Sequence, residues 1–191
     1  MNIVLAISTI ILRLLPHFPN FTPIGAMALF GGAYLPKKYS MPFIIATLIL
    51  SDYLLLYINP FSSRWINLET FYPPSALIHS TTIFVYGSVL INLIIGKLFL
   101  SNLSINRLIG VPLLSSLQFF LITNLGVWVT GMYSRGIEGL LQSYIMALPF
   151  FKFTILGDLF YVILFFGAYE IALRIQLNKQ HLSLQWYISL E

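Results

Sequence analysis

Arg13, Asp52 and Asp158 lie within or at the rim of strongly apolar stretches. In a lipid bilayer an ionised side chain costs roughly 2.5 to 3.5 kcal/mol on insertion scales unless it is paired or hydrated. Arg13 and Asp158 fall at compatible depths for a buried ion pair, and Asp52 competes for the same arginine. We favour a structural ion pair that ties helices together over the alternative, a ligand or proton site.

Aromatic and polar side chains gather in the connections at one end of the apolar stretches. Aromatic walls with a few placed polar groups are the usual composition of a small-molecule pocket. The alternative is an aromatic belt at the level of the lipid headgroups, but a belt does not require the long proline-rich loop at residues 59–75. The candidate ligand-binding residues are Asn20, Phe21, Trp65, Tyr72, His79, Asn124, Trp128 and Arg135.

His79 is expected about one turn into an apolar segment, where it faces the pocket, coordinates a metal centre carried by a ligand, or is simply an interfacial polar residue. No second histidine stands three or four residues away and no carboxylate accompanies it, so no metal site built by the protein is expected. Phosphate-binding, zinc-protease and serine-hydrolase motifs are missing. We therefore expect no enzyme and no cofactor. An aspartyl protease pair of Asp52 and Asp158 would lack any flanking signature.

The elements that must position these residues follow from the composition. Of the 191 residues, 58% are hydrophobic and 8% charged, against roughly 25% charged in an ordinary soluble domain. The composition predicts an all-α integral membrane protein, a bundle of about six transmembrane helices forming a single domain over residues 1–191. The expected spans are 3–15, 22–35, 39–58, 76–100, 108–130 and 153–175. The apolar stretch near 138–150, broken by Pro149, is too short for a span and predicts a short re-entrant or interfacial helix.

The basic residues give the expected orientation. One set falls on a single side if the six spans alternate: Lys37, Lys38, Lys97, Arg107, Arg174 and Lys179. The smaller set falls on the other side: Arg13, Arg64, Arg135 and Lys152. By the positive-inside rule both termini are cytoplasmic, in a multi-pass protein of a bacterial cytoplasmic (inner) membrane. The charges lie near segment ends rather than in a basic stripe, which argues against nucleic-acid binding. The chain has no cysteine, so it has no disulfide framework and no thiolate chemistry.

Small residues form one helix face in the second segment. Ala28 and Gly32 make a small-xxx-small pair, and Gly25 lies about one turn before Ala28 on nearly the same face. Such a face lets another helix approach closely in lipid. The approaching helix belongs either to this chain or to a partner.

Several motifs carry a resemblance to a known class of protein. They are RLLPH at residues 13–17, PNFTPI at 19–24, TNLGVW at 123–128, PFF at 149–151 and GD at 157–158. Together with the size and six-helix plan, they resemble an uncharacterised family of small bacterial membrane proteins related to the substrate-binding S components of energy-coupling factor (ECF) vitamin transporters. The resemblance covers nearly the whole chain.

The resemblance implies a ligand held from outside by the first, third and fifth connections. It also implies that the small-residue face docks on a transmembrane coupling subunit. Some S components act alone, including cobalamin transporters that ligate cobalt through a cysteine. This chain has no cysteine, and His79 is the nearest substitute. The implied partners are membrane lipid, a small-molecule ligand, and an ECF-type coupling subunit with its ATPases where the protein does not act alone.

Two functions follow. The first is uptake of a small, vitamin-like organic nutrient, such as cobalamin or a precursor, by an S-component-like mechanism without chemistry on the substrate. The second is a non-transporting membrane scaffold, similar in size and hydropathy to rod-shape-determining MreD proteins.

Overall fold

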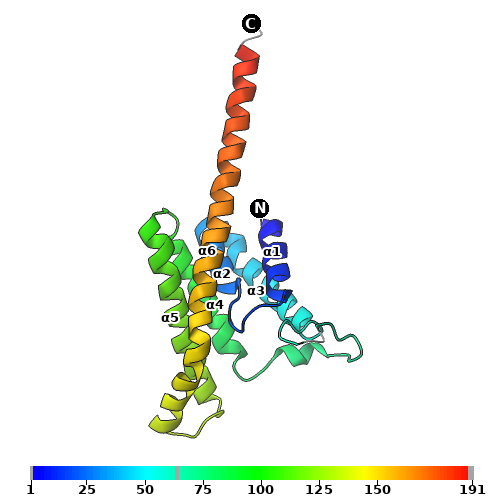
Figure 1. The fold of residues 1–191 in the computed structure, drawn as a ribbon, viewed down its shortest axis with the longest axis vertical. Helices are drawn as coiled ribbons and strands as arrows, with labels where there is room; N and C mark the ends of the chain where they lie inside the picture. Colours follow the sequence, from blue (N-terminus) through cyan, green and yellow to red (C-terminus); the bar gives the residue numbers. More distant parts are fainter. Residues whose placement is uncertain (1, 63–64, 189–191) are drawn as a thin grey trace.

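The computed structural model describes residues 2–62 and 65–188, and these residues form helices and loops without a strand. An isolated antiparallel bridge joins Ile58 and Ile66. Six α-helices and one short 3-10 helix follow one another along the chain (Figure 1). Their bounds are α1 Asn2–Leu14, α2 Ile24–Tyr34, α3 Lys37–Leu55, η1 Pro74–Leu77, α4 Thr82–Phe99, α5 Ile105–Val129 and α6 Ile137–Ile188. The expected all-α class is confirmed.

Three of these helices are long and apolar enough to cross a membrane: α4, α5 and α6 over Ile137–Lys179. Helices α1 and α2 are apolar but shorter. The α4–α5 connection lies at the upper end of the bundle in Figure 1 and the α5–α6 connection at the lower end, so these helices alternate in direction. The basic residue Arg64, used above for the orientation, lies outside the described residues.

Helix α2 lies at the centre of the bundle, because its residues from Ala26 to Leu29 are inaccessible to solvent. It packs against α4 without side chains between the two backbones. A Cβ atom on Gly32 would lie 1.9 Å from the carbonyl oxygen of Leu93, and one on Gly96 would lie 2.0 Å from that of Leu29. The glycines therefore permit backbone contact between α2 and α4.

Of the two alternatives for the small-residue face at Gly25, Ala28 and Gly32, the structure shows packing against helices of this chain. Ala28 is fully buried, Gly32 meets α4, and Gly25 meets Asp158 of α6. The small residues serve packing within the chain, because Gly96 supplies the matching small residue on α4.

The prediction of a short re-entrant or interfacial helix near 138–150 is wrong, because α6 runs without interruption through Pro149. Pro149 removes one backbone donor, but α5 supports the helix on both sides of it. The ring of Phe120 lies 5.6 Å from that of Tyr144 and 4.4 Å from that of Phe151, and the Tyr144 hydroxyl donates to the carbonyl of Leu121. At 52 residues, α6 is about 78 Å long and projects far beyond the bundle towards the C-terminus (Figure 1).

The span expected at 76–100 begins later, because α4 starts at Thr82. The backbone N–H of His79 donates to the Thr82 hydroxyl at 2.9 Å, and the His79 ring contacts the Thr81 hydroxyl at 3.0 Å. These local bonds compete with helical hydrogen bonding. His79 consequently precedes α4 instead of lying one turn into it.

Candidate functional site

The loop from Pro16 to Phe21 joins α1 to α2 and is bound tightly to α6. The Phe18 ring stacks on Phe153 with centroids 4.9 Å apart, and the Phe21 ring lies 5.4 Å from that of Tyr161. Gly157 lets the loop backbone pass close by, since a Cβ there would lie 3.1 Å from the Cα of Phe21. Aromatic contacts of this kind stabilise by about 0.5 to 1.5 kcal/mol each beyond burial.

Asn20 gives this loop its turn. Its φ of 66° makes it the described non-glycine residue with left-handed backbone geometry, a conformation that asparagine tolerates better than most residues. The N–H of Phe21 donates to the carbonyl of Phe18 at 3.0 Å and that of Thr22 to the carbonyl of Asn20 at 3.0 Å. The loop is thus a folded element, not a loose linker.

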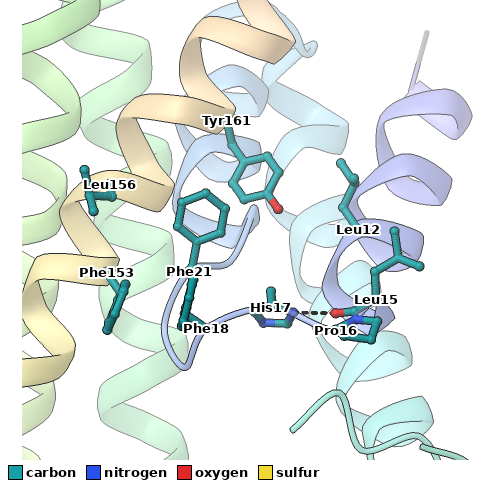
Figure 2. A pocket seen from close by; sticks show the side chains of 9 residues that line it. All are labelled: Leu12, Leu15, Pro16, His17, Phe18, Phe21, Phe153, Leu156 and Tyr161. Carbon is teal, nitrogen blue, oxygen red and sulfur yellow. Dashed lines mark hydrogen bonds between the residues drawn. The ribbon is translucent and has the colours of Figure 1, made fainter.

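Three hollows surround this loop, and we call them together the loop hollow. The first has a volume of about 450 Å³ and lies between α1, the loop and α6 (Figure 2). The second, of about 290 Å³, lies between the loop, α5 and α6. The third, of about 500 Å³, lies between the loop and Pro60 and Phe61 of the long connection before α4. Residues of the loop from Pro16 to Phe21 line all three.

The first hollow is almost entirely apolar. Its lining consists of Leu12, Leu15, Pro16, His17, Phe18, Phe21, Phe153, Leu156 and Tyr161. The ring of His17 is the polar exception, together with the Tyr161 hydroxyl (Figure 2). The Nδ1 atom of His17 lies 2.6 Å from the carbonyl oxygen of Leu15. Because a carbonyl only accepts, Nδ1 carries the proton and a neutral ring has its lone pair on Nε2.

The second hollow is more polar. Asn20 from the loop, Thr123 and Asn124 from α5, and Thr154 from α6 line it together with aromatic side chains. The Asn124 amide also donates to the carbonyl of Phe120 within its own helix. Of the eight candidate ligand-binding residues, Asn20 and Asn124 therefore meet at this hollow, and Phe21 lines the first one.

The other five candidates lie elsewhere. Trp65 donates its indole N–H to the carbonyl of Leu14 at 2.9 Å and so caps the C-terminal end of α1. Tyr72 makes an edge contact with Tyr57. His79 and Arg135 are exposed, and the indole nitrogen of Trp128 is buried without a hydrogen-bond partner. None of these five lines any of the three hollows.

The structure pairs Arg13 with Asp52. Their Nη1 and Oδ1 atoms lie 2.5 Å apart, and the side chains are 16% and 21% exposed. Arg13 also donates to the Ser51 hydroxyl, and the Tyr86 hydroxyl donates to the second oxygen of Asp52 at 2.6 Å. This cluster joins α1, α3 and α4.

Asp158 takes no part in that cluster. It is 4% exposed, and the Ser116 hydroxyl of α5 donates to its Oδ2 at 2.6 Å. Among the described residues no cationic side chain forms an ion pair with it. A second buried polar group joins α4 and α5, where the Gln118 amide donates to Asn92 at 2.6 Å.

Sequence reasoning missed the importance of His17, Phe153 and Tyr161. The two prolines that enclose His17 and Phe18 were a usable signal, because they predict a rigid turn at the end of an apolar run. Phe153 and Tyr161 carry no such signal, since they are two aromatic residues among many in an apolar helix. The part of the chain that the structure describes holds no group of three His, Asp or Glu residues able to bind a metal.

Comparison with known families decides the classification. A family model matches residues 1–181. The chain belongs to DUF6580, a family of unknown function. For this DUF6580 protein, neither curated proteins nor solved structures give a match.

Proposed function

We propose that this DUF6580 protein binds a small, vitamin-like organic nutrient at the loop hollow and takes part in its uptake, in the manner of an ECF S component. The observation that carries the proposal is that one folded aromatic loop lines three hollows. Clefts of about 300 to 1,000 Å³ with mostly apolar walls and few polar groups are typical ligand sites. The volumes of about 450 and 500 Å³ fall in this range.

The chemistry of the walls supports a planar or ring-bearing ligand of the vitamin class. Phe18, Phe21 and Phe153 offer ring faces and edges for stacking, while Asn20 and Asn124 offer amide groups that fix orientation. No reaction on the ligand is part of the proposal.

The proposal includes a setting: a bacterial cytoplasmic membrane, crossed several times, with both termini in the cytoplasm and the loop hollow facing outwards. An ECF-type coupling subunit with its ATPases is the proposed energy source. The alternative is uptake by this chain alone. Uptake into vesicles that contain only this protein would distinguish the two mechanisms.

The test is ligand-dependent thermal stabilisation of the purified protein with a vitamin panel that includes cobalamin and its precursors. Because binding to the folded state alone raises its stability by mass action, one compound should raise the melting temperature of the wild type. Phe18→Ala and Asn124→Ala should weaken that rise at least tenfold in ligand concentration.

Phe99→Ala is the matched control, since Phe99 is exposed at the C-terminal end of α4 and lines none of the three hollows. It should leave the ligand response unchanged. No rise with any compound of the panel, or equal loss in the control, would contradict the proposed site.

A membrane scaffold of the MreD type is the second candidate, and the length of α6 favours it. The part of α6 that projects beyond the bundle (Figure 1) offers a surface to a protein partner. This candidate predicts co-purification with a cell-shape complex and altered cell shape on deletion. A deletion strain with normal shape but impaired growth on a limiting nutrient would exclude it.

A further inference from the structure

We propose that Asp158 is a proton-binding site inside the bundle, holding an exchangeable proton on its carboxyl group, and that loss of this proton loosens the junction of α2, α5 and α6. The inference concerns a residue that lines none of the three hollows. It therefore goes beyond ligand binding and does not depend on the ligand proposed above.

Burial without a counter-charge is the first argument. Asp158 is 4% exposed in a helix long and apolar enough to cross a membrane. Its hydrogen-bond partner is the neutral hydroxyl of Ser116. An isolated ionised carboxylate in such surroundings is strongly unfavourable, so the group takes up a proton instead.

The carboxyl group of Asp158 also has little space around it. Gly25 of α2 lies so close that a Cβ atom on it would be 2.1 Å from Oδ1 of Asp158. This contact closes the α2 side of the group, and Ser116 occupies the α5 side. A proton fits in this junction, whereas a hydrated metal ion would require the helices to separate.

The helices packed on either side bring no charge close to the carboxyl group. The titratable side chain of α2 is Tyr34, which lies about 14 Å along the helix from Gly25. The titratable side chain of α5 is Arg107, about 14 Å along the helix from Ser116. Neither is within reach of Asp158 without rearrangement.

On α6 itself the nearest titratable side chain is Tyr161, whose ring is buried against Phe21. Lys152 and Glu170 lie about 9 Å and 18 Å along the helix. His17, in the loop next to α6, makes its hydrogen bond to Leu15. A negative charge on Asp158 would thus stand alone in the junction.

One polar residue of α6 lies between Asp158 and the loop hollow. Thr154 lines the second hollow together with Asn20 and Asn124, and it lies about 6 Å along α6 from Asp158, or one helical turn. Transient opening of this one turn is enough for proton exchange with the hollow. Deprotonation would favour the opened arrangement, because hydration relieves the unpaired charge.

Infrared spectroscopy of the full chain in lipid vesicles tests the proposal directly. A protonated carboxyl group has a C=O stretching band separate from that of a carboxylate, and the band shifts in heavy water. We expect this band at neutral pH and its loss on raising the pH. Asp158→Asn should abolish it, whereas the matched variant Asp52→Asn should retain it.

Stability gives a second measurement. If the folded protein binds a proton that the unfolded chain releases, the free energy of unfolding falls as the pH rises. The wild type should show this fall and Asp158→Asn should not. If Asp158→Asn does not fold, Ser116→Ala replaces it and should shift the frequency of the carboxyl band. Absence of the band at neutral pH, its survival in Asp158→Asn, or an unchanged frequency in Ser116→Ala would overturn the proposal.

Discussion

Asp52 of α3 and Asp158 of α6 are both aspartates in apolar helices, yet their partners and their burial differ. Asp52 receives an arginine from α1 and a tyrosine hydroxyl from α4, and it is partly exposed. Asp158 receives one serine hydroxyl and is buried. The difference shows that an acidic residue in an apolar segment can hold helices together through an ion pair, or can be a site whose charge depends on the packing around it.

The Arg13–Asp52 ion pair matters because α1 is weakly attached to the rest of the bundle. The backbone of α1 packs against α3 and α2 but not against α6, and a groove of about 650 Å³ lies between α1 and α6. The Arg13–Asp52 pair, with the bond from Trp65 to Leu14, fixes the end of α1 that enters the loop hollow. Asp158 instead lies where three helices already meet.

The largest expected effect comes from leaving Asp52 without its cation. Arg13→Met should lower the free energy of unfolding by about 3 kcal/mol, because removing one member of a mostly buried pair leaves the other charge without a partner. Equilibrium unfolding in mixed micelles measures the change. Lys97→Met is the control, since Lys97 is exposed and should matter by less than about 0.5 kcal/mol. Equal effects of the two variants would remove the distinction between Asp52 and Asp158.

An intermediate effect is expected at the Asp158 junction. Gly25→Ala places a methyl group against Oδ1 of Asp158 and should destabilise by about 1 to 3 kcal/mol, the usual cost of overpacking. The control Gly167→Ala meets no atom within 4 Å. Combining Gly25→Ala with Asp158→Ser should restore part of the loss. No rescue in the double variant, measured by the same unfolding experiment, would show that the strain lies elsewhere.

The smallest expected effect is that of Asp158→Asn, and it tests the difference between Asp52 and Asp158 directly. Asp158→Asn keeps the size of the side chain and an oxygen that accepts from Ser116, so a protonated aspartic acid loses little on replacement. We expect less than about 1 kcal/mol. Asp52→Asn removes the charge that pairs with Arg13 and should cost more. Unfolding of both variants side by side at neutral pH checks this order, and a larger cost at Asp158 would reverse our assignment.

Much of the fold was accessible from the sequence. The expected spans 22–35 and 108–130 are close to α2 and α5, because apolar runs bounded by proline, lysine or polar turns leave few alternatives. The errors at 76–100 and 138–150 arose because hydropathy contains no information on specific contacts. The start of α4 depends on hydrogen bonds around His79. The continuity of α6 through Pro149 depends on packing against Phe120, which is distant in the chain.

The candidate site was less accessible. Asn20, Phe21 and Asn124 line hollows. Trp65 instead donates a hydrogen bond to Leu14, and Tyr72 packs against Tyr57. An aromatic residue in a loop carries no information about whether its ring faces a hollow or a neighbouring helix. That choice depends on how the loop folds back on α1 and α3.

The sequence by itself determined that Arg13, Asp52 and Asp158 stand in apolar segments, where an unpaired charge is costly, because composition and order along the chain decide this. Only the tertiary structure decided which aspartate takes Arg13. The pairing follows from α1 packing on α3 and not on α6, a choice of neighbours that no local pattern encodes. The same packing left Asp158 against Gly25 and Ser116, where a carboxyl group has no cation within reach.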